Sequence, residues 1–340
     1  MRRRAMCYAW DEPMIGFIAK RFINYAILAA IATLSAYALA SAILNPAARY
    51  YGRNPRPSDD TINAILDGLG VNPNTPVIER MWNWLVNLVT QGSLGETIHN
   101  TTVVSEIAAR AGTSLRLLIM GTIIAAVFGV VLGVWGAVRQ YKFSDQAISY
   151  ASFTILATPS FVVGILLMIL ATLLNNVLGI QLISFTGEYT AGLDGGWWVQ
   201  FWDRAVHLLL PTISLALLGA AAYSRYQRSA MLDVLSADYI RTARSKGRTR
   251  GSALVRHGVR VALIPMSTYF AYSFATVLAG AAVTELVFSW HGMGEMLVNA
   301  ITQSDINAFT GAILFNAVLI LIAGTLSDIV YAALDPRVRV

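Results

Sequence analysis

The stretch that decides how this chain folds is Asp238-Tyr239-Ile240-Arg241-Thr242-Ala243-Arg244-Ser245-Lys246-Gly247. It belongs to a longer polar and basic interruption, residues 224–262, which separates two apolar runs. Apolar runs of about 20 residues with few or no charges are typical of membrane-spanning helices. The interruption is therefore a loop outside the membrane, and its basic charge indicates the side on which it lies.

The composition of the whole chain is that of a membrane protein. Its 340 residues are 56% hydrophobic and only 13% charged, whereas soluble domains have about 45–50% apolar and about 25% charged residues. The net charge of +6 would suggest nucleic acid in a soluble protein, but here the basic residues lie in short loops between apolar runs. We expect membrane lipid around the chain and no nucleic-acid partner. The single cysteine, Cys7, excludes an intramolecular disulfide and gives no support to a cysteine-based metal site.

The apolar runs predict six transmembrane helices, at residues 22–44, 117–138, 147–174, 208–223, 263–290 and 308–334. Thr158-Pro159-Ser160 interrupts the third run, and Pro211 lies in the fourth. Six spans place both termini on one side of the membrane. Most of the 25 Lys and Arg residues fall in the loops of that side, which predicts cytoplasmic N- and C-termini. The expected fold class is an all-α polytopic membrane protein.

Residues 45–112 predict a small external domain between the first and second transmembrane helices. They are rich in turn-forming residues, and they contain two amphipathic helical patterns. The patterns are Ile62, Ile65, Leu66, Leu69 and Val77, Met81, Trp84, Leu85, Leu88. Trp82 and Trp84 suit a membrane–water interface. We divide the chain into residues 1–112, the first span with this cap, and residues 113–336, a core of five spans.

Within the basic loop, one short helix is predicted from Ala237 to Lys246. Ser236 suits the N-cap, Asp238 favours the first turn and Gly247 marks the end. The helix places Tyr239, Ile240, Ala243 and Gly247 on one face. Such a helix suits docking into a groove of a soluble partner. The residues alone equally allow a solvated loop whose arginines only set the topology.

No catalytic motif accompanies these features. The chain has no Gly-x-x-x-x-Gly-Lys-Ser/Thr phosphate loop, no His-Glu-x-x-His and no Gly-x-Ser-x-Gly, so an intramembrane enzyme is poorly supported. Glu285 is an acid near a span end, where it either has a function or reaches the membrane interface. Asn316 suits an interhelical hydrogen bond. Together with Pro159 and Ser160, these two residues are our candidates for a translocation path or gate.

Residues 239–247, followed by Arg256-His257-Gly258-Val259-Arg260 and Leu263-Ile264-Pro265, closely resemble the cytoplasmic coupling loop of ABC-importer permease subunits. That family carries Glu-Ala-Ala-x-x-x-Gly. Here Ala243 and Gly247 match, whereas Arg241 and Thr242 replace Glu and Ala. These departures, and the long interval from Gly247 to Pro265, resemble the oligopeptide/dipeptide branch of the family.

Other segments resemble the same branch in the same order. They are residues 91–97, residues 158–161, residues 285–294, where His291 stands for the usual Pro, and residues 331–339. The N-terminal helix with its cap resembles the first, B-type, permease of the pair that such importers use.

The resemblance implies a type I ABC importer permease fold and a non-catalytic subunit that moves oligopeptides or dipeptides into the cytoplasm by alternating access. It implies a second homologous permease, two ATPase subunits that bind ATP and Mg, and an external peptide-binding protein. The chain itself would bind no cofactor or metal and would lie in the bacterial plasma (inner) membrane. The residues that couple it to the ATPase would be Asp238, Tyr239, Ile240, Arg241, Ala243 and Gly247.

Two alternatives stay open. One is an ABC permease for a nickel chelate or another small solute, because that branch shares this loop. The other is a secondary transporter or a membrane-anchored interaction protein that needs no ATPase.

Overall fold

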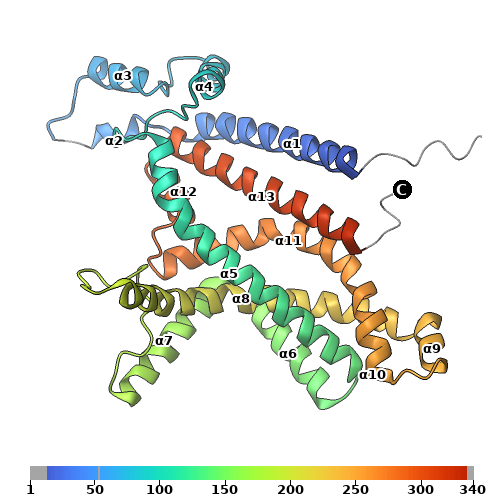
Figure 1. The fold of residues 1–340 in the computed structure, drawn as a ribbon. Helices are drawn as coiled ribbons and strands as arrows, with labels where there is room; N and C mark the ends of the chain where they lie inside the picture. Colours follow the sequence, from blue (N-terminus) through green and yellow to red (C-terminus); the bar gives the residue numbers. More distant parts are fainter. Residues whose placement is uncertain (1–13, 53, 335–340) are drawn as a thin grey trace, which may run out of the picture.

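A computed structural model of the chain describes residues 14–52 and 54–334, and within them the fold is helical (Figure 1). Five helices are long and apolar enough to cross a membrane: α1 (Met14–Ile43), α5 (Val103–Val138), α7 (Ser160–Leu178), α8 (Trp197–Leu235) and α13 (Ile306–Leu334). The α11 helix (Val259–Val287) belongs to a sixth span, whose arms 251–270 and 273–287 meet at 57°. When this bent pair is counted as one span, the described residues contain the six transmembrane helices that the sequence predicts.

The most extensive packing joins α5 to α8, which cross the middle of the molecule (Figure 1). A side chain at Gly133 of α5 would place its Cβ 2.6 Å from the carbonyl oxygen of Ser224 on α8, so the two backbones meet where only glycine fits. The α1 helix lies along α13, and α11 packs on α13 and α8. Close approach through small residues is the usual way in which helices pack inside a membrane.

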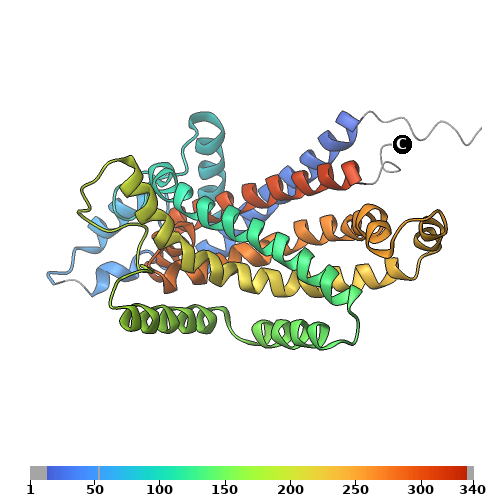
Figure 2. The ribbon, with the colours of Figure 1, turned by 60° about the horizontal axis from the view of Figure 1, so that its bottom comes forward.

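The predicted break in the third span is also confirmed. The α6 helix (Phe143–Ala157) ends at Thr158, which is extended, and Pro159 precedes the first residue of α7. Figure 2 shows α6 and α7 running one after the other along one edge of the molecule. A proline at this place has no N–H to donate to the preceding turn, so the helix stops and restarts.

The two spans that exceed their predicted lengths most are α5 and α8. The α5 helix begins at Val103 rather than Leu117, and the hydroxyl of Thr102 caps it by accepting a hydrogen bond from the Ser105 N–H (3.3 Å). The charges that made residues 103–112 look like loop are paired on the helix, Glu106 with Arg110. The domain boundary that we placed after residue 112 therefore falls inside α5, and the cap ends before this helix. Likewise α8 exceeds the predicted residues 208–223 at both ends, with Pro211 inside it, because its polar ends continue the helix beyond the apolar run.

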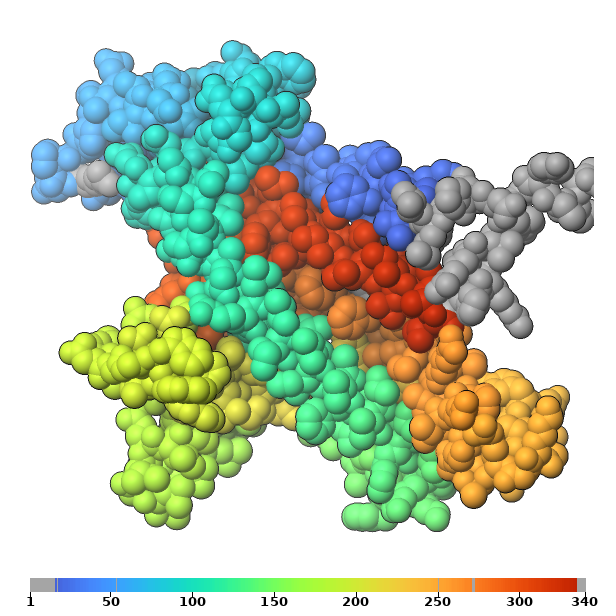
Figure 3. All heavy atoms as spheres, in the orientation of Figure 1, coloured from blue at the N-terminus to red at the C-terminus, as the bar shows by residue number. Residues whose placement is uncertain are grey.

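The cap consists of α2 (Ala48–Tyr51), α3 (Asp59–Gly68) and α4 (Val77–Gln91). Both predicted amphipathic helices are present as α3 and α4. Their apolar sides, including Leu66 and Trp84, join Tyr37 of α1 in one buried cluster. Figure 3 shows the cap, in blue to cyan, gathered at one end of the molecule.

The basic loop lies at the opposite end. It contains α9 (Asp238–Ser245), α10 (Arg250–Ala253) and a π-helical turn, Leu254–Gly258, which leads into α11. Figures 1 and 2 both show α9 at the end where α1 begins and α13 finishes, away from α2, α3 and α4. The molecule therefore has a cap end and a basic-loop end, with the spans between them.

Candidate functional site

The α9 helix has eight residues, fewer than the ~12–15 that an isolated helix needs for stability in water. It begins after Ala237, which provides no side-chain cap, and the Ser236 hydroxyl instead donates to the Asp233 carbonyl oxygen (3.0 Å). The predicted capping by Ser236 is therefore wrong, because that hydroxyl serves the end of α8. The predicted stop is confirmed, since Gly247 has φ +86°, a left-handed value that glycine adopts without strain.

The inner face of α9 packs against the chain itself. Ile240 is 4% exposed and lies in a buried cluster with Met231, Val234 and Leu254, and Ala243 is also buried. We predicted both as contacts to an ATPase, but the structure turns them inward. An eight-residue helix is too short to be stable alone, so its apolar side is used to hold it on the protein. Ile240 and Ala243 therefore position the helix rather than present a surface.

The outer face of α9 is formed by its exposed residues, which are Asp238, Tyr239, Arg241, Thr242, Arg244 and Ser245. Tyr239 keeps 41% of its surface exposed. The Arg241 guanidinium lies 3.7 Å from the Asp238 carboxylate, and both side chains are largely in solvent. Such an exposed pair contributes little to stability. The outer face therefore presents an aromatic ring and two guanidinium groups that a partner can contact.

A partly buried ion pair connects α8 to α6, the helix that precedes the break in the third span. The α8 helix ends at Leu235, just before α9, and its Arg228 donates to both carboxylate oxygens of Asp145 on α6 (2.6 and 2.8 Å). Asp145 also accepts from the Tyr141 N–H (2.9 Å), and its side chain is 3% exposed. Bidentate pairs of this kind fix orientation as well as distance. Sequence reasoning counted Arg228 only as a loop charge, and nothing in the spacing marked a partner so distant along the chain.

Glu285 lies in a node that joins three helices. Its carboxylate accepts hydrogen bonds from the Ser114 hydroxyl of α5 (2.5 Å) and from the Gly294 N–H (2.7 Å), at the start of α12 (Met293–Thr302). Glu285 is 1% exposed. The alternative in which it reaches the membrane interface is therefore wrong. A carboxylate at a helix N-terminus is favourable, since free N–H groups and the helix dipole both point to it.

The four candidates for a translocation path separate into two groups. Glu285 and Asn316 border one cavity of about 190 Å³ between α5, α11, α12 and α13. Pro159 is exposed at the junction of α6 and α7, and neither it nor Ser160 borders that cavity. The Glu285 carboxylate is hydrogen-bonded to Ser114 of α5 and Gly294 of α12, so beside this cavity it joins these two helices to α11.

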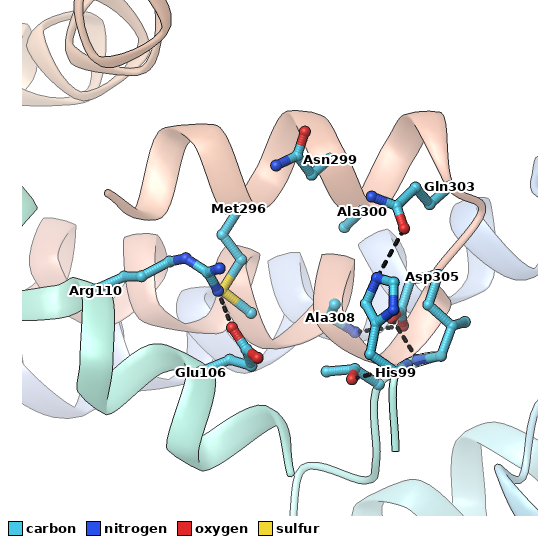
Figure 4. Close-up of a pocket in the computed structure, with 11 residues that line it drawn as sticks. His99, Glu106, Arg110, Met296, Asn299, Ala300, Gln303, Asp305 and Ala308 are labelled. Carbon is cyan, nitrogen blue, oxygen red and sulfur yellow. Dashed lines mark hydrogen bonds and ion pairs between the residues drawn. The ribbon is translucent and has the colours of Figure 1, made fainter. Parts of the chain in front are cut away.

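A second pocket lies at the cap end, between the loop before α5 and the turn from α12 to α13 (Figure 4). It has a volume of about 130 Å³. Asp305 is buried beside it and accepts from the N–H groups of Ile98 (2.8 Å) and Ala308 (2.9 Å). Burial raises the pKa of Asp305, and the two hydrogen bonds oppose this rise. His99 contacts Gln303 through its Nε2 atom (2.9 Å). The hydrogen bonds of Asp305 thus hold the loop before α5 against the start of α13.

A larger groove, of about 590 Å³, opens between α6, α8 and α11. Its walls include the rings of Tyr226 and Tyr269, which stack with centroids 4.3 Å apart, and the guanidinium of Arg225 over the ring of Phe153 at 4.2 Å. Sequence reasoning missed this groove, because its residues come from three separated segments. Among the described residues, no group of three or more His, Cys, Asp or Glu side chains is placed to hold a metal ion.

Comparison with known proteins places this architecture. Residues 129–340 match the family described as binding-protein-dependent transport system inner membrane component. The oligopeptide transport system permease protein OppB of Mycobacterium tuberculosis is 46% identical over 327 residues, which cover 96% of this chain and 100% of that protein. The oligopeptide transport system permease protein AppB of Bacillus subtilis is 35% identical over 288 residues, or 84% of this chain and 87% of that protein.

Among solved structures, a chain of the MetNI methionine ABC transporter, determined in inward-facing conformations, matches with a TM-score of 0.53 and 12% identity. The match covers 68% of this chain and 97% of that chain. The expected type I ABC importer permease fold is confirmed by this likeness. The family resemblance seen in residues 239–247 is confirmed by the relatives: this chain belongs to the binding-protein-dependent transport system inner membrane components, the permeases of ABC importers.

Proposed function

We propose that the chain is a permease subunit of an ATP-driven importer that moves oligopeptides or dipeptides into the cytoplasm. The observation that carries this proposal is the 46% identity, over 96% of the chain, to a protein named as an oligopeptide permease. The cap between the first two spans makes it the first, B-type, permease of a pair. A second homologous permease, two ATPase subunits and an external peptide-binding protein complete the assembly.

In this proposal the outer face of α9 docks on an ATPase subunit. ATP and Mg are held by the two ATPases, and this chain supplies no catalytic group and binds no cofactor. The termini and the basic loop lie in the cytoplasm, the cap lies outside, and the spans cross the bacterial plasma membrane. The positive charge of the basic loop supports this orientation, since Arg241, Arg244 and Lys246 all lie at the end opposite the cap.

Movement of α9 reaches the membrane by two routes. The first is α8, which runs without a break from Trp197 to Leu235. The second is the Arg228–Asp145 pair, which carries the movement of α8 to the start of α6. Closure of the ATPases then rocks these helices as a body, and the path alternates between outward-open and inward-open states.

The groove between α6, α8 and α11 is the part of the chain that we assign to the inner half of the path. Aromatic walls at Tyr226 and Tyr269 suit side chains of varied shape, because ring contacts are apolar and tolerant of sequence. Tyr269→Ala should lower peptide uptake while leaving assembly with the ATPases intact. Unchanged uptake in this variant would remove the groove from the path.

The proposed function is tested by uptake in the source organism. Deletion of the gene should abolish growth on a peptide that supplies a required amino acid, and the intact gene should restore it. Gly247→Asp should fail to restore it although the protein inserts into the membrane, because φ +86° strains any residue with a side chain. Growth on peptides after deletion, with loss of nickel uptake, would instead favour a nickel-chelate permease. A stable purified complex without any ATPase would favour a secondary transporter.

A further inference from the structure

The cap helix α4 has a wider apolar face than the chain covers. One part of this face, with Trp84 and Leu88, packs into the buried cluster of the cap. The other part is a stripe of four exposed residues, Ile78, Trp82, Val86 and Val89, at intervals of four, four and three residues. Ile78 and Val89 are each 76% exposed, and Trp82 is 63% exposed. The stripe therefore follows one side of the helix for its whole length with nothing from the described chain on it.

The opposite side of α4 is polar and faces a hollow of the cap. Glu79, Asn83 and Asn87 border a pocket of about 230 Å³ that also includes Asn307 from the start of α13. The helix is thus oriented with its polar side toward a pocket lined by polar residues and its stripe away from the core of the protein. A helix with this division of residues is typical of one that lies in a membrane interface.

The contact between α4 and α1 places α4 near the outer end of that span. The ring of Trp84 lies 5.7 Å from the ring of Tyr37 on α1. From Tyr37 the α1 helix continues to Ile43, which adds roughly 9 Å toward the outside at 1.5 Å per residue. Figures 1 and 2 show α4 lying across the outer end of α1, with its axis turned away from the direction of the spans. The α4 helix therefore lies inward of the end of a transmembrane helix, not beyond it.

The neighbouring part of α1 has the same exposed apolar character. Leu39 is 60% exposed and Ile43 is 76% exposed, as expected for side chains that face lipid. The stripe of α4 continues this lipid-facing surface at the level of the last turns of α1.

We propose that α4 is an interfacial anchor whose stripe, Ile78, Trp82, Val86 and Val89, inserts into the outer leaflet of the bilayer. Trp82 then lies at the headgroup level, where indole rings are favoured. The occupant of the stripe is the apolar part of the lipid rather than an anionic headgroup, because the charged residues of α4 are Glu79 and the buried Arg80. Insertion holds the cap at a fixed depth while the spans move. This inference does not depend on the cargo of the importer.

The test is site-directed spin labelling of the full-length permease assembled with its ATPases in nanodiscs. Cys7, the chain's single cysteine, is replaced by Ser, and single cysteines are placed at the stripe (Ile78→Cys, Val89→Cys) and at the polar side (Asn83→Cys, Asn87→Cys). Collision rates of each nitroxide with oxygen, which enters lipid, and with a water-soluble nickel chelate are then compared. Variants that assemble with the ATPases as the parent does are the ones compared.

We expect the ratio of oxygen to nickel-chelate collisions to be several-fold higher at both stripe positions than at both polar positions, in neutral and in anionic lipid alike. Equal ratios on the two sides would overturn the proposal. Stripe labels shielded from both reagents when the external binding protein is added would also overturn it, because a protein and not lipid would then cover the stripe. A strong requirement for anionic lipid would contradict the apolar mode of insertion.

Discussion

Ile240 is the residue whose truncation best separates the holding of α9 from its docking. Its side chain is 4% exposed and packs among Met231, Val234 and Leu254. Truncating a buried Ile to Ala costs about 2–5 kcal/mol. The eight residues of α9 fall short of the ~12–15 residues that an isolated helix needs in water. The inner face must therefore supply much of the stability of the docked helix. A loss of about 3 kcal/mol lowers the ratio of docked to undocked helix roughly 100-fold.

The measurement is amide hydrogen exchange of residues 238–245 in the full-length permease, combined with peptide uptake by the reconstituted complex. Ile240→Ala should raise exchange in α9 and lower uptake, while the spans keep their protection. Ile240→Val is the matched control, because it costs about 0.5–1.5 kcal/mol and should leave the helix docked. Tyr239→Ala should lower uptake with normal exchange, since Tyr239 belongs to the outer face and is 41% exposed.

Two results would refute this reasoning. If Ile240→Ala leaves the exchange of α9 at the wild-type rate, the inner face does not hold the helix. If exchange rises while uptake stays normal, the docked position of α9 is not needed for transport.

Three further predictions concern the spans and the outer pocket. Gly133→Ala should destabilise the protein in thermal unfolding by about 1–3 kcal/mol, because the new Cβ would meet the Ser224 carbonyl oxygen; Gly112→Ala, on the same helix with open space around its Cβ, should not. Arg228→Gln should cost up to about 3–5 kcal/mol, less because the Arg228 side chain is 27% exposed, and adding Asp145→Asn should recover part of the loss. The pKa of Asp305 is raised in the folded protein, because burial makes the charged carboxylate less favourable. The contribution of Asp305 to stability is therefore fully present below the ordinary aspartate pKa of about 3.9. This contribution is lost as the pH rises through the pKa of the folded state. Across this pH window the free energy of unfolding should therefore fall less with rising pH in Asp305→Asn than in the wild type.

The spans were predictable because a bilayer requires long apolar helices. Such apolar runs can be recognised in the sequence without knowledge of the tertiary contacts. The start of α5 was not, since Glu106 and Arg110 read as loop charges until the helix brings them into an ion pair. The length of α8 was not predictable for a related reason. A helix can continue into water beyond the apolar run from which it is predicted.

The α9 helix was predictable in place but not in orientation. Its amphipathic pattern identified the helix and its glycine stop, yet a pattern cannot say whether an apolar face meets a partner or the same chain. Ile240 and Ala243 face the chain's own core. The contacts of Glu285 with Ser114, and of Arg228 with Asp145, join residues far apart in sequence. No local rule links such residues, so only the packed structure could bring them together.

The outer face of α9 departs from the family pattern at the position of the Glu. Arg241 stands at that position and is paired with Asp238 one turn earlier. If this face docks on an ATPase subunit as proposed, the contact must accommodate a guanidinium where the family has a carboxylate.

The central claim is that the outer face of α9 contacts an ATPase subunit, and site-specific photo-crosslinking tests it most directly. A benzophenone amino acid replaces Tyr239 in the complete complex, with the same amino acid at exposed Asn83 of the cap as the control. Illumination should join residue 239 to an ATPase subunit and should give no such product from residue 83. A complex that transports peptide but yields no ATPase adduct from residue 239 would contradict the claim.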